Sequence, residues 1–241
     1  RDLGIHWAQE SFDQGAMVRE FVKWDYELRF GSQIETIIDR SLAITQSEPC
    51  GPVYLTLPRE ALAARIKSFA PSNAPRITAA SLTIPARDAV KKVGGLLSSA
   101  KKPIAIVRSL GRDPRGVKIL VELAEILAMP VIEQWHTHLN FPQSHPLHAG
   151  YDPAPYLKEA DVIMAIESDV PWFPKHSEPK PETTIIQVAS DALYTDYPYR
   201  GFASDHSLSG NPRQSLRALR DEILSRKMNQ TAVKRRLDHW R

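Results

Sequence analysis

The sequence predicts an α/β protein whose larger part is a doubly wound parallel sheet. Two patterns carry this prediction. Short, fully apolar segments alternate with amphipathic segments of helical periodicity over residues 86–226. A shorter stretch, 1–60, contains a helix and a strand of its own and is followed by a proline-rich segment. With 241 residues, 42% of them hydrophobic, the chain can bury a sizeable core in one or two domains.

The first stretch predicts one helix and one strand. Apolar residues recur at helical spacing over 33–46, which indicates an amphipathic helix. The sequence Pro-Cys-Gly-Pro at 49–52 ends it, and the apolar run 53–57 predicts a strand. Residues 61–85 hold three prolines among Ser, Asn and Ala. Because such a composition cannot pack a core, we expect an interdomain linker there.

The second stretch predicts a regular alternation of elements. The expected helices cover 90–97, 117–127, 156–160 and 216–224, and the expected strands cover 104–107, 129–132, 161–166 and 184–188. Short apolar strands separated by amphipathic helices are typical of a parallel sheet that is covered on both faces. Right-handed crossovers then give a Rossmann-like central domain at 86–226.

The positive charge of the chain is concentrated at its end. From Arg213 to Arg241 there are nine Lys/Arg and three Asp/Glu, a net charge of +6. The whole chain carries +3, so the remainder carries 3 − 6 = −3. We expect 227–241 to be a basic helical tail or linker with a solvated face, and we predict no nucleic-acid partner.

The single cysteine and the absence of long apolar runs indicate the compartment. Cys50 cannot form an internal disulfide, which favours a reducing environment. No apolar run approaches the roughly 20 residues that span a bilayer. We therefore expect a cytoplasmic protein without a membrane partner.

Ligands of open parallel sheets bind in the crevice at the carboxyl ends of the strands. Those ends supply the candidate binding residues, namely Ser109, Gly111, Ser168 and Asp191. The turn after the first strand lacks the Gly-x-Gly-x-x-Gly pattern, and Arg108 stands where a small residue would let a pyrophosphate approach. A phosphate-binding Gly-x-x-x-x-Gly-Lys-Ser/Thr run is also absent.

Neither a metal centre nor a nucleophilic centre is predicted. Four histidines at 136, 138, 145 and 148 lie in a loop interrupted by prolines, with no Cys or acidic residue between them. Zinc sites hold their ligands at close, regular positions, so we expect these histidines to form hydrogen bonds instead. No Gly-x-Ser-x-Gly elbow exposes a serine. We predict no catalytic residue in this chain.

Several motifs together resemble one family. They are Gln9-Glu10, the Val-Lys-Trp run at 22–24, the long run Glu-Pro-Cys-Gly-Pro-Val-Tyr-Leu-Thr-Leu-Pro-Arg-Glu at 48–60, and the later stretches 99–103, 141–147 and 159–163. The chain resembles thiamine-diphosphate-dependent enzymes of the acetolactate synthase, benzoylformate decarboxylase and oxalyl-CoA decarboxylase group. By this resemblance, 1–60 is the C-terminal part of the pyrimidine-binding domain and 86–226 is the central domain.

The resemblance implies a function for the complete protein. It would be a lyase or carboligase acting on 2-keto acids with thiamine diphosphate and Mg²⁺, as a homodimer or homotetramer. The family's activating glutamate lies upstream of this segment, and no Gly-Asp-Gly motif for the Mg-diphosphate occurs in it. We therefore expect an incomplete piece that supports the active site and is inactive alone. Gln9 and Lys23 would lie near the substrate entrance.

The sequence departs at two places from the pattern of family members that bind FAD. Members that bind FAD carry a glycine-rich turn after the first central strand and a Gly-x-Arg after the third. This chain has Arg108-Ser109-Leu110-Gly111 and Glu167-Ser168-Asp169 at those places, so we expect no tight FAD binding.

Two other functions stay open: a free-standing module that binds a nucleotide or small ligand in the crevice, and a structural or oligomer-forming domain.

Overall fold

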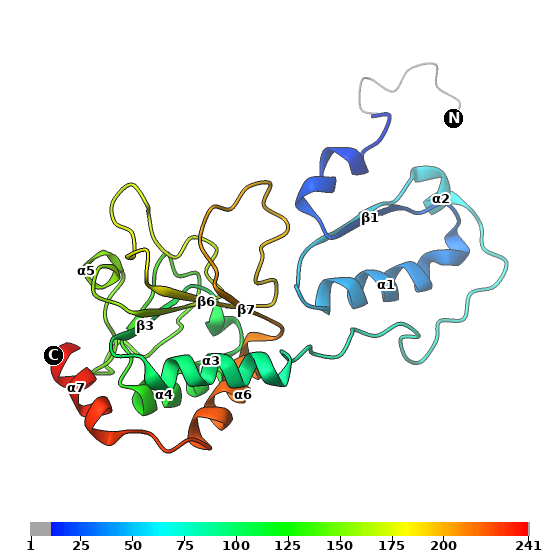
Figure 1. Cartoon of the computed structure of the whole chain (residues 1–241). Helices are drawn as coiled ribbons and strands as arrows, with labels where there is room; N and C mark the ends of the chain where they lie inside the picture. The colour runs from blue at the N-terminus through cyan, green and yellow to red at the C-terminus, as the bar shows by residue number, and fades with distance from the viewer. Residues whose placement is uncertain (1–10, 241) are drawn as a thin grey trace. The chain divides into compact units, whose positions relative to one another are not determined.

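The computed structural model describes residues 11–240 and divides the chain into two compact units, Arg1–Ser81 and Leu82–Arg241. The division falls inside the segment that the sequence predicts to be a linker. Each unit has its own parallel sheet, and they are described separately below (Figure 1). Within residues 11–240, none of the helices has the length and apolarity that crossing a bilayer requires.

The Arg1–Ser81 unit is built around one β-α-β element. Strand β1 (Trp24–Glu27) pairs in parallel with β2 (Val53–Thr56), and helix α1 (Ile34–Gln46) connects them. The short helices are η1 (Gly15–Met17), η2 (Arg19–Phe21), η3 (Gly31–Gln33) and α2 (Arg59–Ala63). The sequence prediction located α1 and β2 but not β1, whose Trp-Asp-Tyr-Glu sequence has no apolar run.

The chain that follows α2 is tied to α1 at three places. The main-chain N–H of Ser72 donates to the Glu35 carboxylate at 2.6 Å, and that of Arg76 donates to Asp39 at 2.8 Å. The N–H of Ala80 donates to Ser47 Oγ at 2.9 Å. The extended segment therefore follows the surface of α1, because side chains of that helix satisfy its backbone.

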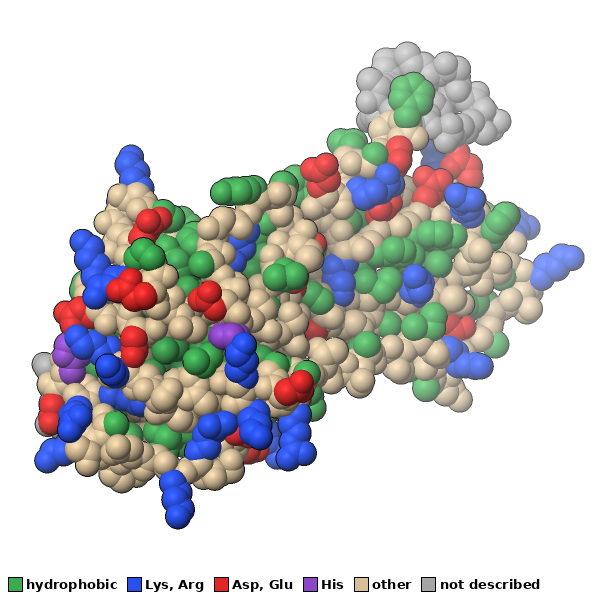
Figure 2. Space-filling view, viewed as in Figure 1, with side chains coloured by type: hydrophobic (Ala, Val, Ile, Leu, Met, Phe, Trp, Pro, Cys, Tyr) green, Lys and Arg blue, Asp and Glu red, His purple; other side chains and the backbone are tan. Residues whose placement is uncertain are grey.

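Large apolar side chains are exposed on this unit. Those with the greatest exposure include Phe12, Met17, Phe21, Phe30, Leu62 and Phe69. Figure 2 shows green side chains spread over its viewed surface. A two-stranded sheet with one main helix cannot cover this much apolar surface by itself.

The Leu82–Arg241 unit contains a five-stranded parallel sheet in the order β4-β3-β5-β6-β7. The strands are β3 (Pro103–Val107), β4 (Val131–Ile132), β5 (Val162–Ile166), β6 (Thr184–Ala189) and β7 (His206–Ser209). The helices are α3 (Arg87–Ser99), η4 (Leu110–Arg112), α4 (Pro114–Leu127), α5 (Ala154–Leu157), α6 (Pro212–Leu224) and α7 (Gln230–Trp240). The predicted doubly wound α/β sheet is confirmed.

Alternate residues of the strands face opposite layers. Ala105, Met164 and Ile186 are adjacent in register and belong to the core under α3, α4 and α6. Their neighbours Ile104, Ile163 and Ile185 belong to the second core, which α5 and Trp240 help to cover. Strands β3 and β5 are fully apolar because both of their faces are buried, whereas β6 also contains Thr184 and the buried Gln187.

Helix starts follow local capping rather than the apolar pattern alone. The Asp113 side chain accepts from the N–H of Arg115 and starts α4 at Pro114, and Asn211 does the same for α6 by accepting from Gln214. Both helices therefore begin three or four residues before the predicted 117 and 216. The structure adds β7 to the predicted strands, at the sheet edge, where Leu208 alone is buried.

Candidate functional site at the carboxyl edge of the sheet

The order in which successive strands are added to the parallel sheet reverses between β3 and β5. The chain leaves β3 for β4 on one side and returns to β5 on the other, so the connections diverge at the carboxyl ends of these two strands. In doubly wound sheets, this topological switch point is where a crevice opens for ligands. Arg108 and Ser109 follow β3, and Glu167, Ser168 and Asp169 follow β5.

An ion pair connects the two strand ends. The guanidinium of Arg108 bonds the carboxylate of Asp169, whose other oxygen accepts the Tyr197 hydroxyl at 2.6 Å. Asp169 is 8% exposed. Burial alone would raise the pKa of Asp169, but the hydrogen bonds from Arg108 and Tyr197 outweigh it and lower that pKa below its ordinary value. The site therefore holds a permanent carboxylate at neutral pH.

A second arginine reaches this edge of the sheet from the segment after β6. Arg200 Nε donates to the main-chain oxygen of Asp169 at 2.9 Å, and its guanidinium lies 4.6 Å from the ring centre of Tyr194 and 5.1 Å from that of Phe202. Burial lowers the pKa of Arg200, yet an arginine stays charged at any physiological pH. The aromatic rings and carbonyls thus replace water around this cation.

Glu167 has an unusual backbone conformation. Its φ is 46°, in the left-handed region that a non-glycine residue rarely adopts. This conformation lets its carboxylate accept from the N–H of Ser190 at 2.7 Å and pair with Arg112 at 3.2 Å. Glu167 therefore links the ends of β5 and β6 to the turn after β3. Non-glycine residues in this region are often found at functional sites.

The structure brings most of the predicted binding residues to this edge. Ser109 Oγ donates to the main-chain oxygen of Glu167 at 3.2 Å. Ser168 is fully buried, and its Oγ has no hydrogen-bond partner among the residues that the structure describes. Asp191 accepts from the N–H and hydroxyl of Thr195 at 2.6 and 2.7 Å, so its carboxylate organises the turn after β6.

Gly111 lies against the chain's own loop. A Cβ at this position would overlap the main-chain oxygen of Leu139, and the Gly111 N–H donates to Asn140 Oδ1 at 2.9 Å. The glycine is required because loop backbone occupies the space next to it. Its predicted role in binding a cofactor stays a prediction.

The two predicted substrate-adjacent residues belong to the other unit. Gln9 lies outside the described residues. Lys23 donates from Nζ to the main-chain oxygens of Ile44 and Ser47 at 2.8 and 2.7 Å. Its ammonium therefore satisfies carbonyls at the C-terminal end of α1, where a cation is favourable. This structural role requires no substrate.

The histidine-containing loop is held by a buried carboxylate that sequence reasoning missed. Glu133 is fully buried, accepts from the N–H of Asn140 at 2.7 Å, and lies 3.1 Å from His148 Nε2. His136 stacks on Tyr151, and His145 lies 3.2 Å from Glu125. Within the described range, no group of three His, Cys, Asp or Glu side chains could hold a metal ion. The sequence signal that could have revealed this buried carboxylate is the position of Glu133 directly after the apolar strand β4.

A cavity of about 280 Å³ opens at the same edge beyond β4. Four aromatic side chains contribute to its walls, namely Trp135, Tyr151, Trp172 and Phe173, and its polar lining consists of Gln134, Asp152, His176 and Ser177. Trp135 has φ 47°, is 58% exposed, and contacts Phe173 edge to face at 4.7 Å between ring centres. The cavity suits a flat group that also carries polar atoms.

The sheet order and the flanking helices define a doubly wound α/β domain. The family model for the central domain of thiamine pyrophosphate enzymes matches residues 90–219, more than half of the chain. The chain belongs to this family, as the sequence motifs predicted.

Curated relatives agree with the family. Over 177 residues the chain is 29% identical to a sulfoacetaldehyde acetyltransferase of Rhodobacter capsulatus, covering 69% of this chain and 28% of the relative. Over 181 residues it is 26% identical to a benzoylformate decarboxylase of Pseudomonas aeruginosa, covering 70% and 33%. The chain thus spans about a third of the length of these relatives.

Solved structures share the fold. A protein from Mycobacterium smegmatis described as thiamin diphosphate-dependent matches with a TM-score of 0.71 and 21% identity, over 88% of this chain and 41% of that one. The benzoylformate decarboxylase of Polynucleobacter necessarius matches with a TM-score of 0.69 and 23% identity, over 87% and 40%. At this identity the likeness shows the fold alone.

The described residues do not fit thiamine diphosphate. Its diphosphate requires a divalent cation with oxygen ligands, but at the sheet edge Asp169 and Glu167 already pair with Arg108 and Arg112, and Asp191 accepts two hydrogen bonds from Thr195. No step of thiamine chemistry is therefore assigned to side chains of this unit.

Proposed function

We propose that this chain is the central domain, together with the last β-α-β element of the pyrimidine-binding domain, of a thiamine-diphosphate-dependent lyase or carboligase that acts on 2-keto acids. The observation that carries the proposal is the family match over 90–219 directly after a separate β-α-β unit. Thiamine would supply the carbanion chemistry, and protein groups outside this chain would bind its diphosphate with Mg²⁺.

In this proposal the chain has a supporting role. The Arg108–Asp169–Tyr197 network holds the carboxyl edge of the central sheet rigid, since each member is fixed by at least one charged hydrogen bond. The exposed apolar side chains of the Arg1–Ser81 unit would be covered by further strands of a complete pyrimidine-binding domain. The complete protein would be a cytoplasmic homodimer or homotetramer.

Thiamine diphosphate binding tests the proposal. Calorimetric titration with thiamine diphosphate and Mg²⁺ should give no heat of binding for the 241-residue chain. The protein encoded by the complete open reading frame should bind the cofactor stoichiometrically. If that longer protein does not bind thiamine diphosphate, or if the 241-residue chain binds it alone, the assignment of roles is wrong.

A second candidate is a module that binds a small anionic ligand in the crevice. The unpartnered, buried Ser168 hydroxyl favours it, with Arg108 and Arg112 within the same edge. Titration with FAD and with ADP distinguishes the two functions. We expect flavin fluorescence to stay unchanged, because Arg200 and Tyr197 occupy the carboxyl edge where a cofactor would lie.

A further inference from the structure

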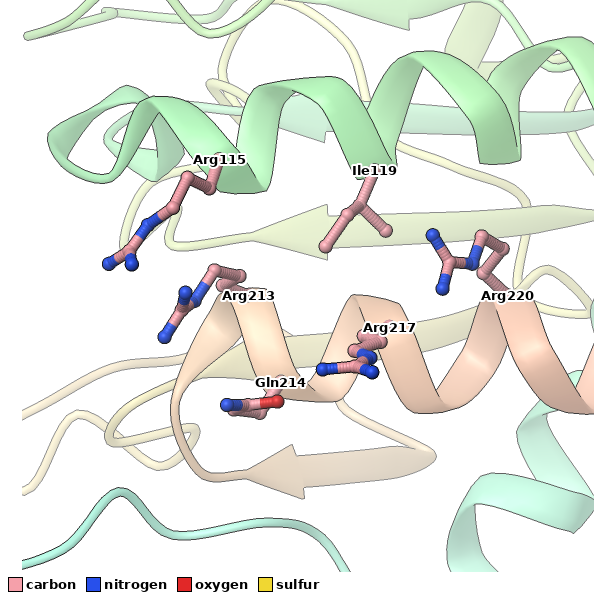
Figure 3. A pocket seen from close by; sticks show the side chains of 6 residues that line it. All are labelled: Arg115, Ile119, Arg213, Gln214, Arg217 and Arg220. Atoms are coloured by element: carbon pink, nitrogen blue, oxygen red, sulfur yellow. The ribbon is translucent and has the colours of Figure 1, made fainter.

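A separate groove lies between α4 and α6, on the helical side of the Leu82–Arg241 unit. It encloses about 320 Å³ and is lined by Arg115, Ile119, Arg213, Gln214, Arg217 and Arg220. Figure 3 shows Arg115 and Ile119 on α4 facing the other four residues on α6, with Arg115 and Arg213 at one end and Arg220 at the other. Neither the family match nor the crevice accounts for four arginines here.

Carboxylates hold three of the four guanidinium groups in place. Asp113 pairs with Arg115 at 2.9 Å and with Arg213 at 3.1 Å. Arg220 pairs with Glu122 at 2.7 Å and with Asp221 at 2.8 Å. These pairs lower the pKa of Asp113, chiefly through its hydrogen bond with Arg115, so the carboxylate stays ionised. The arginines are thus oriented in advance of any ligand.

Positive charge nevertheless remains. The groove has four arginines against the three carboxylates that pair with them, 4 − 3 = +1, and Arg217 has no carboxylate partner among residues 11–240. Arg115 and Arg213 also lie in the first turns of α4 and α6. Neither of these two first turns contains an acidic residue. Helix N-termini carry partial positive charge, so arginine is unfavourable there for stability alone.

The spacing of the arginines indicates the shape of the anion. Arg213, Arg217 and Arg220 lie on one face of α6 because they are separated by four and three residues. At a rise of about 1.5 Å per residue, they extend over roughly 10 Å of the helix. A row of this length suits an anion with several charged groups in line, rather than a single phosphate ion.

We propose that this groove binds a small molecule that carries a di- or triphosphate chain. Guanidinium groups bind phosphate oxygens in pairs through parallel N–H donors, which a lysine cannot reproduce. Gln214, at the groove wall, adds an amide that can donate to the same chain. The proposal goes beyond the thiamine function and does not depend on it, since no groove residue belongs to the Arg108–Asp169–Tyr197 network.

The test compares two exposed helical arginines. Arg217→Gln removes the unpaired groove charge, and Arg235→Gln removes another exposed charge, from α7. The 241-residue chain and each variant are titrated calorimetrically with tripolyphosphate in EDTA at low ionic strength. We expect Arg217→Gln to weaken binding about tenfold, the effect of losing one charged hydrogen bond, and Arg235→Gln to leave it within about twofold.

The remaining arms separate the sources of the phosphate chain. Binding of ATP that is tighter than that of tripolyphosphate indicates a nucleotide, and equal binding indicates that only phosphates are recognised. Both results support the groove. Equal affinities of Arg217→Gln and Arg235→Gln would overturn it, as would tighter binding of a poly-glutamate peptide. Thermal unfolding of the two variants should coincide, because Arg217 makes no ion pair that the substitution removes.

Discussion

The guanidinium of Arg236 donates to the main-chain oxygen of Leu127 at 2.8 Å, across 109 residues of sequence. The same guanidinium donates to the main-chain oxygen of Ser98 at 2.8 Å and also to that of Ala100. Arg236 is 1% exposed. These carbonyls belong to the C-terminal ends of α3 and α4, where helix dipoles favour a cation. One arginine from α7 therefore caps two helices at once.

Replacing this arginine should destabilise the Leu82–Arg241 unit. Arg236→Leu leaves several buried carbonyls without donors, so we expect the free energy of unfolding to fall by about 2–4 kcal/mol. Arg235→Gln, one residue earlier and exposed, should change it by less than about 0.5 kcal/mol. Urea denaturation of both variants measures the difference. Equal stabilities would show that α7 does not dock as described.

Asp169 should make the stability of the protein pH-dependent. Its pKa is lowered in the folded state, so its stabilisation is complete above the ordinary pKa of about 3.9 and is lost as the pH falls toward the lower folded value. We expect Asp169→Asn to cost about 2–3 kcal/mol at pH 7 and progressively less below about pH 4. Denaturation at a series of pH values checks this. A cost that does not change with pH would contradict the ion pair with Arg108.

Gly111 should not tolerate even a methyl group. A Cβ would meet the main-chain oxygen of Leu139, which cannot rotate away as a flexible side chain can. We expect Gly111→Ala to cost about 1–3 kcal/mol through overpacking. Gly95→Ala is the control, because Gly95 lies within helix α3 and a Cβ there would approach only the flexible end of the Arg226 side chain. The control should be neutral or stabilising by up to about 1 kcal/mol in thermal denaturation.

The two units should differ in their ability to fold alone. Residues 82–241 contain a complete sheet with both faces covered, so we expect a cooperative melting transition. The described part of 1–81 has a two-stranded sheet, so we expect this fragment not to fold alone. Removing 227–241 from the larger fragment should lower its melting temperature because Arg236 is lost. Circular dichroism melts of the three fragments test this, and a stable 1–81 fragment would contradict the proposed boundary.

Periodicity in the sequence located the central elements well. Strands β3 and β5 are fully apolar because they are buried on both faces, so their composition alone distinguishes them. Strand β7 buries Leu208 only, and β1 contains two acidic residues, so neither carries a recognisable pattern. Strands without an apolar run, such as β1 and β7, are therefore the elements that such reasoning misses.

The positions of residues after strands also predicted which residues lie at the carboxyl edge, but not the hydrogen bonds that they form there. Ser109, Ser168 and Asp191 follow strands, which made them candidates. The pairing of Asp169 with Tyr197, 28 residues away, depends on how one loop folds back over the sheet. Arg236 was even less accessible to prediction, because an arginine in a basic segment is nearly always exposed.

Carbon dioxide release from 2-keto acids tests the central proposal most directly. The protein encoded by the complete open reading frame, with thiamine diphosphate and Mg²⁺, should release carbon dioxide from pyruvate or benzoylformate, and the 241-residue chain under the same conditions should release none. Activity that disappears when thiamine diphosphate is omitted would agree with the proposed role. Release by the 241-residue chain alone, or a complete protein that leaves every 2-keto acid unchanged, would contradict it.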